Sequence, residues 1–197
     1  MKKIIWSGLV FFVLILSACG DKLPIETDMS ENVADFTFTN QDNETVARDD
    51  LSGTWWLADF VFTNCETVCL PMTSNMAQLQ GNLAEEDIAI QFVSFSVDPD
   101  YDKPEVLKEY GEEYGVSFEN WDFLTGYDFE TARELSIKSF RAPLQAPSYG
   151  SDQVTHDTRF FLVDPEGNVV KGYDGVNNES IQEIIDDLLS LDEKGLL

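Results

Sequence analysis

The distribution of apolar and polar residues along the chain predicts alternating strands and helices. The segment from Trp55 to Phe62 is almost continuously apolar, which is typical of a strand buried on both faces of a sheet. Pro71 predicts the start of a helix that runs to Leu83, because proline is favoured only in the first turn. Near the C-terminus, the helical spacing of five apolar residues predicts an amphipathic helix packed on a sheet. These residues are Ile181, Ile184, Ile185, Leu188 and Leu189.

The remaining elements complete an α/β pattern. Further strands are expected at 36–38, 44–46, 88–97, 121–124, 158–163 and 169–173, and further helices at 104–114 and 128–140. The segment 141–156 contains two prolines and a glycine and is predicted to be a long loop or hairpin. Helices that connect successive strands imply a parallel centre, and the last two strands form an antiparallel edge. This order matches an α/β thioredoxin-like fold with an N-terminal β-hairpin extension and an inserted loop or hairpin before the strand that carries His156.

The N-terminus has the pattern of a bacterial lipoprotein leader. Two lysines precede an apolar run from Ile4 to Leu16, and Leu16-Ser17-Ala18-Cys19 resembles a lipobox. The sequence therefore predicts a signal peptide at 1–18, a lipidated Cys19 followed by a tether to residue 32, and one domain at 33–197. The expected location is the cell membrane, with the lipid as the anchor and the domain on the extracytoplasmic face.

Composition excludes several classes of function. The chain has 197 residues, of which 43% are hydrophobic, so it can bury the core of one domain. Twelve Lys and Arg against 37 Asp and Glu leave a formal charge of −25, which repels phosphate backbones and excludes nucleic-acid partners. With a single histidine, the chain cannot form a metal site that requires two imidazoles.

Cys65 and Cys69 lie where the buried strand is predicted to give way to the helix. Ligands of open α/β sheets bind at the carboxyl ends of strands. Because Pro71 belongs in the first helical turn, Cys69 is expected close to the start of the helix and Cys65 in the loop before it. The positive end of the helix dipole then favours the thiolate form of both cysteines, while Glu66 has the opposite effect.

Three fates are open to this pair of cysteines. The two thiols could be buried and inert, or they could form a structural disulfide, which their spacing permits. A disulfide that closes so small a loop would stabilise the fold only weakly. A functional dithiol, which reacts reversibly or binds a metal, is the interpretation that we favour.

His156 is the candidate third member of the site. A lone histidine is more often a surface residue than a ligand, but in a thioredoxin-like sheet the strand 158–163 lies beside the strand 55–62. The loop that carries His156 then faces the cysteines. Two thiolates and one neutral imidazole suit copper, because soft thiolates select the soft Cu(I) ion. Zinc would require a fourth ligand, for which Asp157 and Asp98 are the candidates.

Several motifs occur in a fixed order along residues 33–190. They are Phe62-Thr63-Asn64-Cys65 with Cys69, Val97-Asp98-Pro99 with Asp102 and Pro104, Trp121 with Phe123-Leu124-Thr125-Gly126, and His156 before Phe161-Leu162-Val163-Asp164-Pro165 and Gly167. This ordered set resembles the Sco/SenC family. Members of that family are membrane-tethered thioredoxin-like proteins implicated in assembling the binuclear CuA centre of cytochrome c oxidase.

The resemblance implies a copper site and a partner. Cys65, Cys69 and His156 would bind copper as Cu(I) or Cu(II), and the two cysteines would also form a redox-active pair. The implied partner is the copper-bearing subunit of cytochrome c oxidase. Many members have proline after each cysteine, where this chain has Glu66 and Leu70. Neither departure removes a ligand, but both affect the stiffness of the loop and its redox balance.

Two functions from different classes are compatible with these residues. The first is a copper metallochaperone, and the alternative is a thiol-disulfide oxidoreductase that reduces target cysteines without carrying copper. A peroxidase in which Cys65 attacks and Cys69 resolves is a weaker third hypothesis. The sequence also leaves open whether Asp98 belongs to the site or caps a turn before Pro99, and whether Met72 packs in the core or binds metal.

Overall fold

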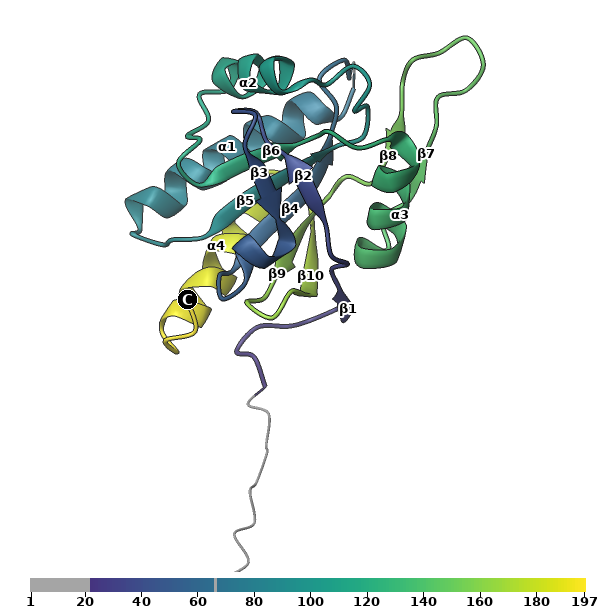
Figure 1. The fold of residues 1–197 in the computed structure, drawn as a ribbon. Helices are drawn as coiled ribbons and strands as arrows, with labels where there is room; N and C mark the ends of the chain where they lie inside the picture. The colour runs from purple at the N-terminus through teal and green to yellow at the C-terminus, as the bar shows by residue number, and fades with distance from the viewer. Residues whose placement is uncertain (1–21, 66) are drawn as a thin grey trace, which may run out of the picture.

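A six-stranded mixed sheet forms the centre of the molecule (Figure 1). The structure is a computed structural model that describes residues 22–65 and 67–197. In sheet order, the strands are β1 (Glu31–Asn32), β10 (Asn168–Asp174), β9 (Arg159–Val163), β4 (Trp56–Val61), β5 (Gln91–Ser96) and β6 (Trp121–Leu124). Strands β4, β5 and β6 are parallel, whereas β9 and β10 are antiparallel. The predicted parallel centre and antiparallel edge are therefore confirmed.

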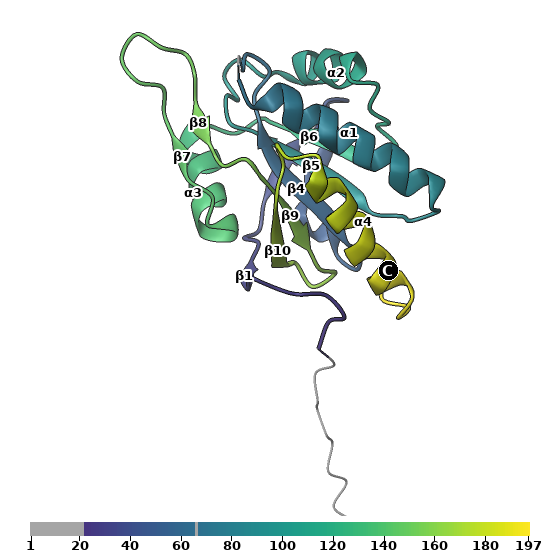
Figure 2. The same ribbon diagram turned by 180° about the vertical axis from the view of Figure 1, so that it is seen from behind.

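Helices and a hairpin cover the two faces of the sheet. Helices α1 (Cys69–Glu85) and α4 (Glu179–Asp192) lie across one face, in front of the sheet in Figure 2, and α2 (Pro104–Glu113) packs beside β6. The opposite face carries α3 (Phe129–Phe140), the hairpin of β2 (Thr37–Thr39) and β3 (Thr45–Ala47), and the short 3-10 helix η1 (Arg48–Leu51). The predicted N-terminal hairpin is thus present, and a bridge between Thr39 and Thr125 joins it to the end of β6.

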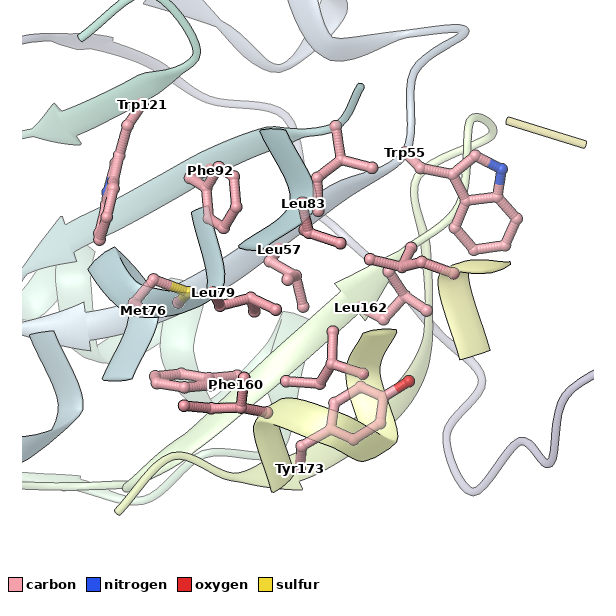
Figure 3. Close-up of a cluster of buried hydrophobic side chains, with 14 of the residues drawn as sticks. Trp55, Leu57, Met76, Leu79, Leu83, Phe92, Trp121, Phe160, Leu162 and Tyr173 are labelled. Carbon is pink, nitrogen blue, oxygen red and sulfur yellow. The ribbon is translucent and has the colours of Figure 1, made fainter. Parts of the chain in front are cut away.

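Strand β4 is buried on both faces, as its apolar sequence predicts. Leu57 and Val61 pack in the layer beneath α1 and α4, and Trp56, Ala58 and Phe60 pack in the layer beneath α3. Figure 3 shows the first layer, in which Leu57 of β4 lies among side chains of α1, β5 and β9. The full burial of each large side chain contributes roughly 1.5–3 kcal/mol, so these layers hold the end of β4 in place.

The predicted inserted segment is a hairpin. Strands β7 (Leu144–Gln145) and β8 (Thr155–His156) pair antiparallel, with Leu144 opposite His156. We call residues 144–156 the His156 hairpin. It projects beside α3 in both views (Figures 1 and 2).

One helix boundary and one buried position differ from the expectation in ways that have a physical reason. Helix α1 begins at Cys69 rather than at Pro71, because the first backbone N–H groups of a helix need no intrahelical acceptor and proline is tolerated throughout that turn. In α4, Leu191 completes the buried stripe, while Leu189 is only partly buried.

Part of the predicted tether at 19–32 contacts the domain. Most of the described residues 22–32 are exposed, but some of them pack on the sheet or pair with it. Ile25 is 6% exposed, Leu23 packs beside it, and β1 pairs with the outer edge of β10. These residues pack because apolar side chains and an unpaired strand edge are available to them. The predicted signal peptide at 1–18 and the lipidation site Cys19 lie outside the described residues. No helix within the described ranges is both long and apolar enough to cross a membrane.

Candidate metal centre

The site lies at the carboxyl end of the central strand. Cys65 is in the loop that follows β4, and Cys69 is the first residue of α1. His156 ends β8, just before β9 pairs with β4. The pairing of β9 with β4 therefore brings together residues that are far apart in the sequence.

The three predicted site residues converge. Their potential ligand atoms lie within 4.8 Å of one another. The Cys69 sulfur is 3.2 Å from Nε2 of His156, and the backbone N–H of Cys69 donates to the Cys65 sulfur over 3.4 Å. Among the described residues, these three form the only such group of cysteine, histidine and carboxylate side chains.

The imidazole of His156 is oriented with Nε2 toward the sulfurs. Nδ1 lies 2.7 Å from the backbone carbonyl oxygen of Asp157. A carbonyl oxygen can only accept a hydrogen bond, so Nδ1 donates to it, and Nε2 is the ring atom directed at the sulfurs. Such a hydrogen bond from the remote nitrogen is the usual way in which proteins orient a metal-binding histidine.

Burial limits access to the site. Cys69 is fully buried and Cys65 is 7% exposed, so an ion reaches the pair from the side of Cys65 and the partly exposed His156. The ring of Phe62 packs edge-on against the imidazole, with 5.8 Å between ring centroids. These apolar surroundings strengthen electrostatic interactions among the three groups.

The two cysteines have opposite acid-base properties. The hydrogen bond from the Cys69 thiol lowers the pKa of Cys65, and His156 and backbone N–H groups lower it further. The same hydrogen bond and burial raise the pKa of Cys69. The two sulfurs do not favour the thiolate form equally, because two adjacent buried thiolates would repel each other. Hydrogen bonding therefore favours the thiolate form at Cys65 over the thiolate form at Cys69.

The other candidate ligands do not join the group. The carboxylate of Asp157 accepts hydrogen bonds from the side chain of Arg159 at 2.8 and 2.9 Å. Asp98 lies outside the cluster of three, and burial, together with the charges of nearby acidic residues, raises its pKa. Met72 is fully buried in the layer under α1 and α4, whereas both cysteines belong to the opposite layer, so its thioether packs in the core.

A buried carboxylate near the site was not anticipated from the sequence. Asp59 is fully buried in β4, and its Oδ1 accepts a 2.6 Å hydrogen bond from the Ser94 hydroxyl. Within the described residues, Oδ2 has no hydrogen-bond partner. Burial raises the pKa of Asp59 to about 6. An aspartate inside an otherwise apolar strand was the available signal.

Replacing Asp59 by asparagine is expected to stabilise the protein at neutral pH. The pKa of Asp59 is raised in the fold, so folding favours its protonated form, and stability falls as pH rises from about 4 to about 6. A shift of this size corresponds to about 3 kcal/mol. Denaturant unfolding at pH 4.5 and pH 8 should show Asp59→Asn gaining up to that amount at the higher pH only. An equal gain at both pH values would contradict a buried charge as the cause.

A second buried carboxylate fixes the loop before Cys65. Asp102 is fully buried and accepts hydrogen bonds from the backbone N–H and the hydroxyl of Thr63, at 3.2 and 2.6 Å. It also accepts one from the Ser96 hydroxyl at 2.6 Å. Burial raises the pKa of Asp102, and these hydrogen bonds oppose that shift. The loop that carries Cys65 is thereby attached to the loop after β5.

This combination of fold and site defines a class of protein. A thioredoxin-like sheet with two thiols and one imidazole at the end of its central strand is the framework of a dithiol protein with a thiolate-rich metal site. The SCO1/SenC family model matches residues 25–191. The chain therefore belongs to the SCO1/SenC family.

Relatives of known structure agree with this assignment. The SCO1 protein homolog of Bacillus subtilis is 48% identical over 93% of each chain. A SCO1/SenC family lipoprotein from Bacillus anthracis is 45% identical, with a TM-score of 0.79 over 83% of this chain and 96% of that one. BsSco, a member of the Sco family of cytochrome c oxidase assembly proteins with a disulfide switch, is 47% identical, with a TM-score of 0.76 over 84% and 97%. Yeast Sco1 with copper bound is 25% identical, with a TM-score of 0.63 over 80% and 87%.

Proposed function

We propose that this protein is a membrane-anchored copper metallochaperone that assists assembly of the CuA centre of cytochrome c oxidase. The observation that carries the proposal is the convergence of Cys65, Cys69 and His156 within 4.8 Å, with Nε2 directed at the sulfurs. The copper-bound yeast relative and the oxidase-assembly relative support the same reading.

The donor set favours copper over zinc. Two thiolates and one imidazole supply soft ligands for a three-coordinate Cu(I) ion. A structural zinc ion requires a fourth protein ligand. Two carboxylates were considered for that position. The carboxylate of Asp157 accepts a hydrogen bond from Arg159, and Asp98 lies outside the group of three ligands.

The proposed location is the extracytoplasmic face of the cell membrane. The lipobox around Cys19 supports this, and a relative from Bacillus anthracis is a lipoprotein. A lipid anchor holds the acidic domain beside a membrane whose anionic surface would otherwise repel it. It also keeps the site close to a membrane-embedded target, for which the copper-bearing subunit of the oxidase is the proposed partner.

Copper titration of the reduced protein tests the proposal. We expect one copper per chain, measured for Cu(I) by competition with a chromophoric chelator. For Cu(II), we expect a thiolate-to-copper charge-transfer absorption band. Met72→Leu is the matched control and should leave both signals unchanged, because the Met72 thioether packs in the core. Failure of the reduced protein to bind copper in either state would refute the proposal.

A second function rests on the unequal cysteines. A reactive thiolate at Cys65 beside a protonated Cys69 is the arrangement that a thiol-disulfide oxidoreductase uses, since the first thiol attacks and the second resolves the mixed disulfide. The disulfide switch of BsSco is consistent with this alternative. This function needs the dithiol but does not need His156.

A further inference from the structure

Asn64, the residue before Cys65, connects the cysteine loop to the His156 hairpin. Its side-chain Nδ2 donates to Oδ2 of Asp152 over 2.9 Å. Its backbone carbonyl oxygen accepts a hydrogen bond from Nε2 of Gln153 over 3.0 Å. We call these two contacts the Asn64 bridge. They join the loop that carries one cysteine to the hairpin that carries the histidine.

The cysteine side of the bridge is held rigidly. Thr63, the neighbour of Asn64, is bound through both its backbone N–H and its hydroxyl to the buried Asp102. Consecutive residues of one loop are therefore attached in two directions, Thr63 to the loop after β5 and Asn64 to the His156 hairpin. The hydrogen bond from Asn64 to the His156 hairpin therefore starts from a loop that is itself held in place by Asp102.

The histidine side is a short hairpin, and the ring itself is held by the hydrogen bond of Nδ1 to the Asp157 carbonyl and by the edge-on contact with Phe62. The two strands of the His156 hairpin pair over only two residues each, Leu144 with His156 and Gln145 with Thr155. The segment between them, 146–154, contains no helix or strand. Most of it is exposed, although Val154 is buried. The position of the imidazole therefore depends on contacts that the hairpin makes outside its own strands.

We propose that Asn64 is a positioning residue for copper binding, which holds the His156 imidazole over the two sulfurs before the ion arrives. The inference rests on the proposed copper function. A ligand that is already in place loses less conformational freedom on binding, so the bridge raises copper affinity. Disulfide exchange forms its bonds at the two sulfurs and none at the imidazole, so the bridge favours copper binding by the cysteines over disulfide exchange.

The test compares Cu(I) affinities of variants of the full chain. Each protein is first reduced and freed of metal, and its affinity is then measured by chelator competition. Asn64→Ala and Asp152→Ala should each weaken Cu(I) binding roughly three- to tenfold, the range expected for one hydrogen bond. Because both changes break the same contact, the double variant should be no weaker than either single variant. Wild-type affinity in Asn64→Ala would overturn the proposal.

Two further variants separate positioning from charge and from general destabilisation. Asp152→Asn removes the charge and keeps one oxygen that can accept from Asn64, although it loses the oxygen that accepts from Gln153, so it should retain clearly higher affinity than Asp152→Ala. If Asp152→Asn is as weak as Asp152→Ala, the effect is electrostatic and the proposal fails. In a His156→Ala background, Asn64→Ala should have no further effect on affinity. An undiminished effect in that background would also overturn the proposal.

A metal-free measurement makes the inference independent of copper binding. His156 is the only histidine of the chain, so its imidazole NMR signals are unambiguous. In Asn64→Ala, these signals should broaden by exchange or shift toward those of a free imidazole. Unchanged signals would overturn the proposal that the Asn64 bridge positions the imidazole. Changed signals in a protein that binds no copper would instead refute the proposed function and leave the bridge intact.

Discussion

Replacing Cys69 by alanine is expected to lower the copper affinity of the protein more than that of any outer-shell variant. The change removes one of the two thiolate ligands and leaves a thiolate and an imidazole, too few for the proposed three-coordinate site. Loss of an outer-shell partner alone typically costs 10- to 100-fold in metal affinity, so loss of a ligand should cost more than about a hundredfold. Chelator competition with Cu(I) measures this directly. Cys65→Ala should give a loss of similar size.

Two controls make the cysteine result interpretable. Cys19→Ala removes the remaining cysteine of the chain and should leave copper affinity unchanged, because Cys19 is proposed to carry the lipid and not to bind copper. The two site variants should also differ in reactivity. In a Cys19→Ala background, alkylation near pH 7 should be slow in Cys65→Ala, because the remaining Cys69 thiol is fully buried. Copper affinity close to wild type in Cys69→Ala would exclude the proposed donor set.

Replacing His156 by alanine is expected to separate the two candidate functions. Copper affinity should fall by about a hundredfold or more, because the imidazole supplies one of three ligands. Thiol-disulfide exchange should persist, since it requires only the two sulfurs. The measurements are copper transfer to the soluble CuA domain of the oxidase subunit and reduction of a disulfide in the same target.

Added imidazole provides a matched rescue for this variant. The removed ring lies beside Phe62 and faces the sulfurs, so free imidazole can occupy its place. Millimolar imidazole should therefore recover part of the copper affinity of His156→Ala and none of that of Cys69→Ala. Full retention of copper transfer in His156→Ala, without imidazole, would favour a site built from the thiols alone. Loss of disulfide exchange in the same variant would show that the ring also supports the dithiol chemistry.

One of the two departures from the family pattern, Leu70 after the second cysteine, has a local explanation. Helix α1 begins at Cys69 without proline at position 70, because Pro71 still lies in the first turn. Leu70 is 48% exposed, so its side chain is not required for packing. The backbone N–H of Cys69 is thus available to donate to the Cys65 sulfur. The ligand geometry is retained although the loop has a different composition.

Local sequence was sufficient for the framework of the fold and for selecting the three residues that converge at the candidate site. The continuous apolar run that forms β4, the proline in the first turn of α1 and the turn signals between strands act over short distances. The N-terminal boundary was less predictable. Leu23 and Ile25 are too few to give a periodic signal, and they become ordered only because the sheet offers a surface on which to pack.

By itself, the sequence determined which groups are available: two thiols four positions apart, one imidazole and an apolar strand leading to them. Only the tertiary structure decided how these groups behave. Pairing of β9 with β4 brings His156 to the sulfurs. The contact between Cys65 and Cys69 lowers the pKa of the first thiol and raises the pKa of the second, and burial raises the pKa of Asp59. The physical reason is that hydrogen bonding, desolvation and ligand geometry depend on distances between residues remote in sequence, which local residue patterns do not encode.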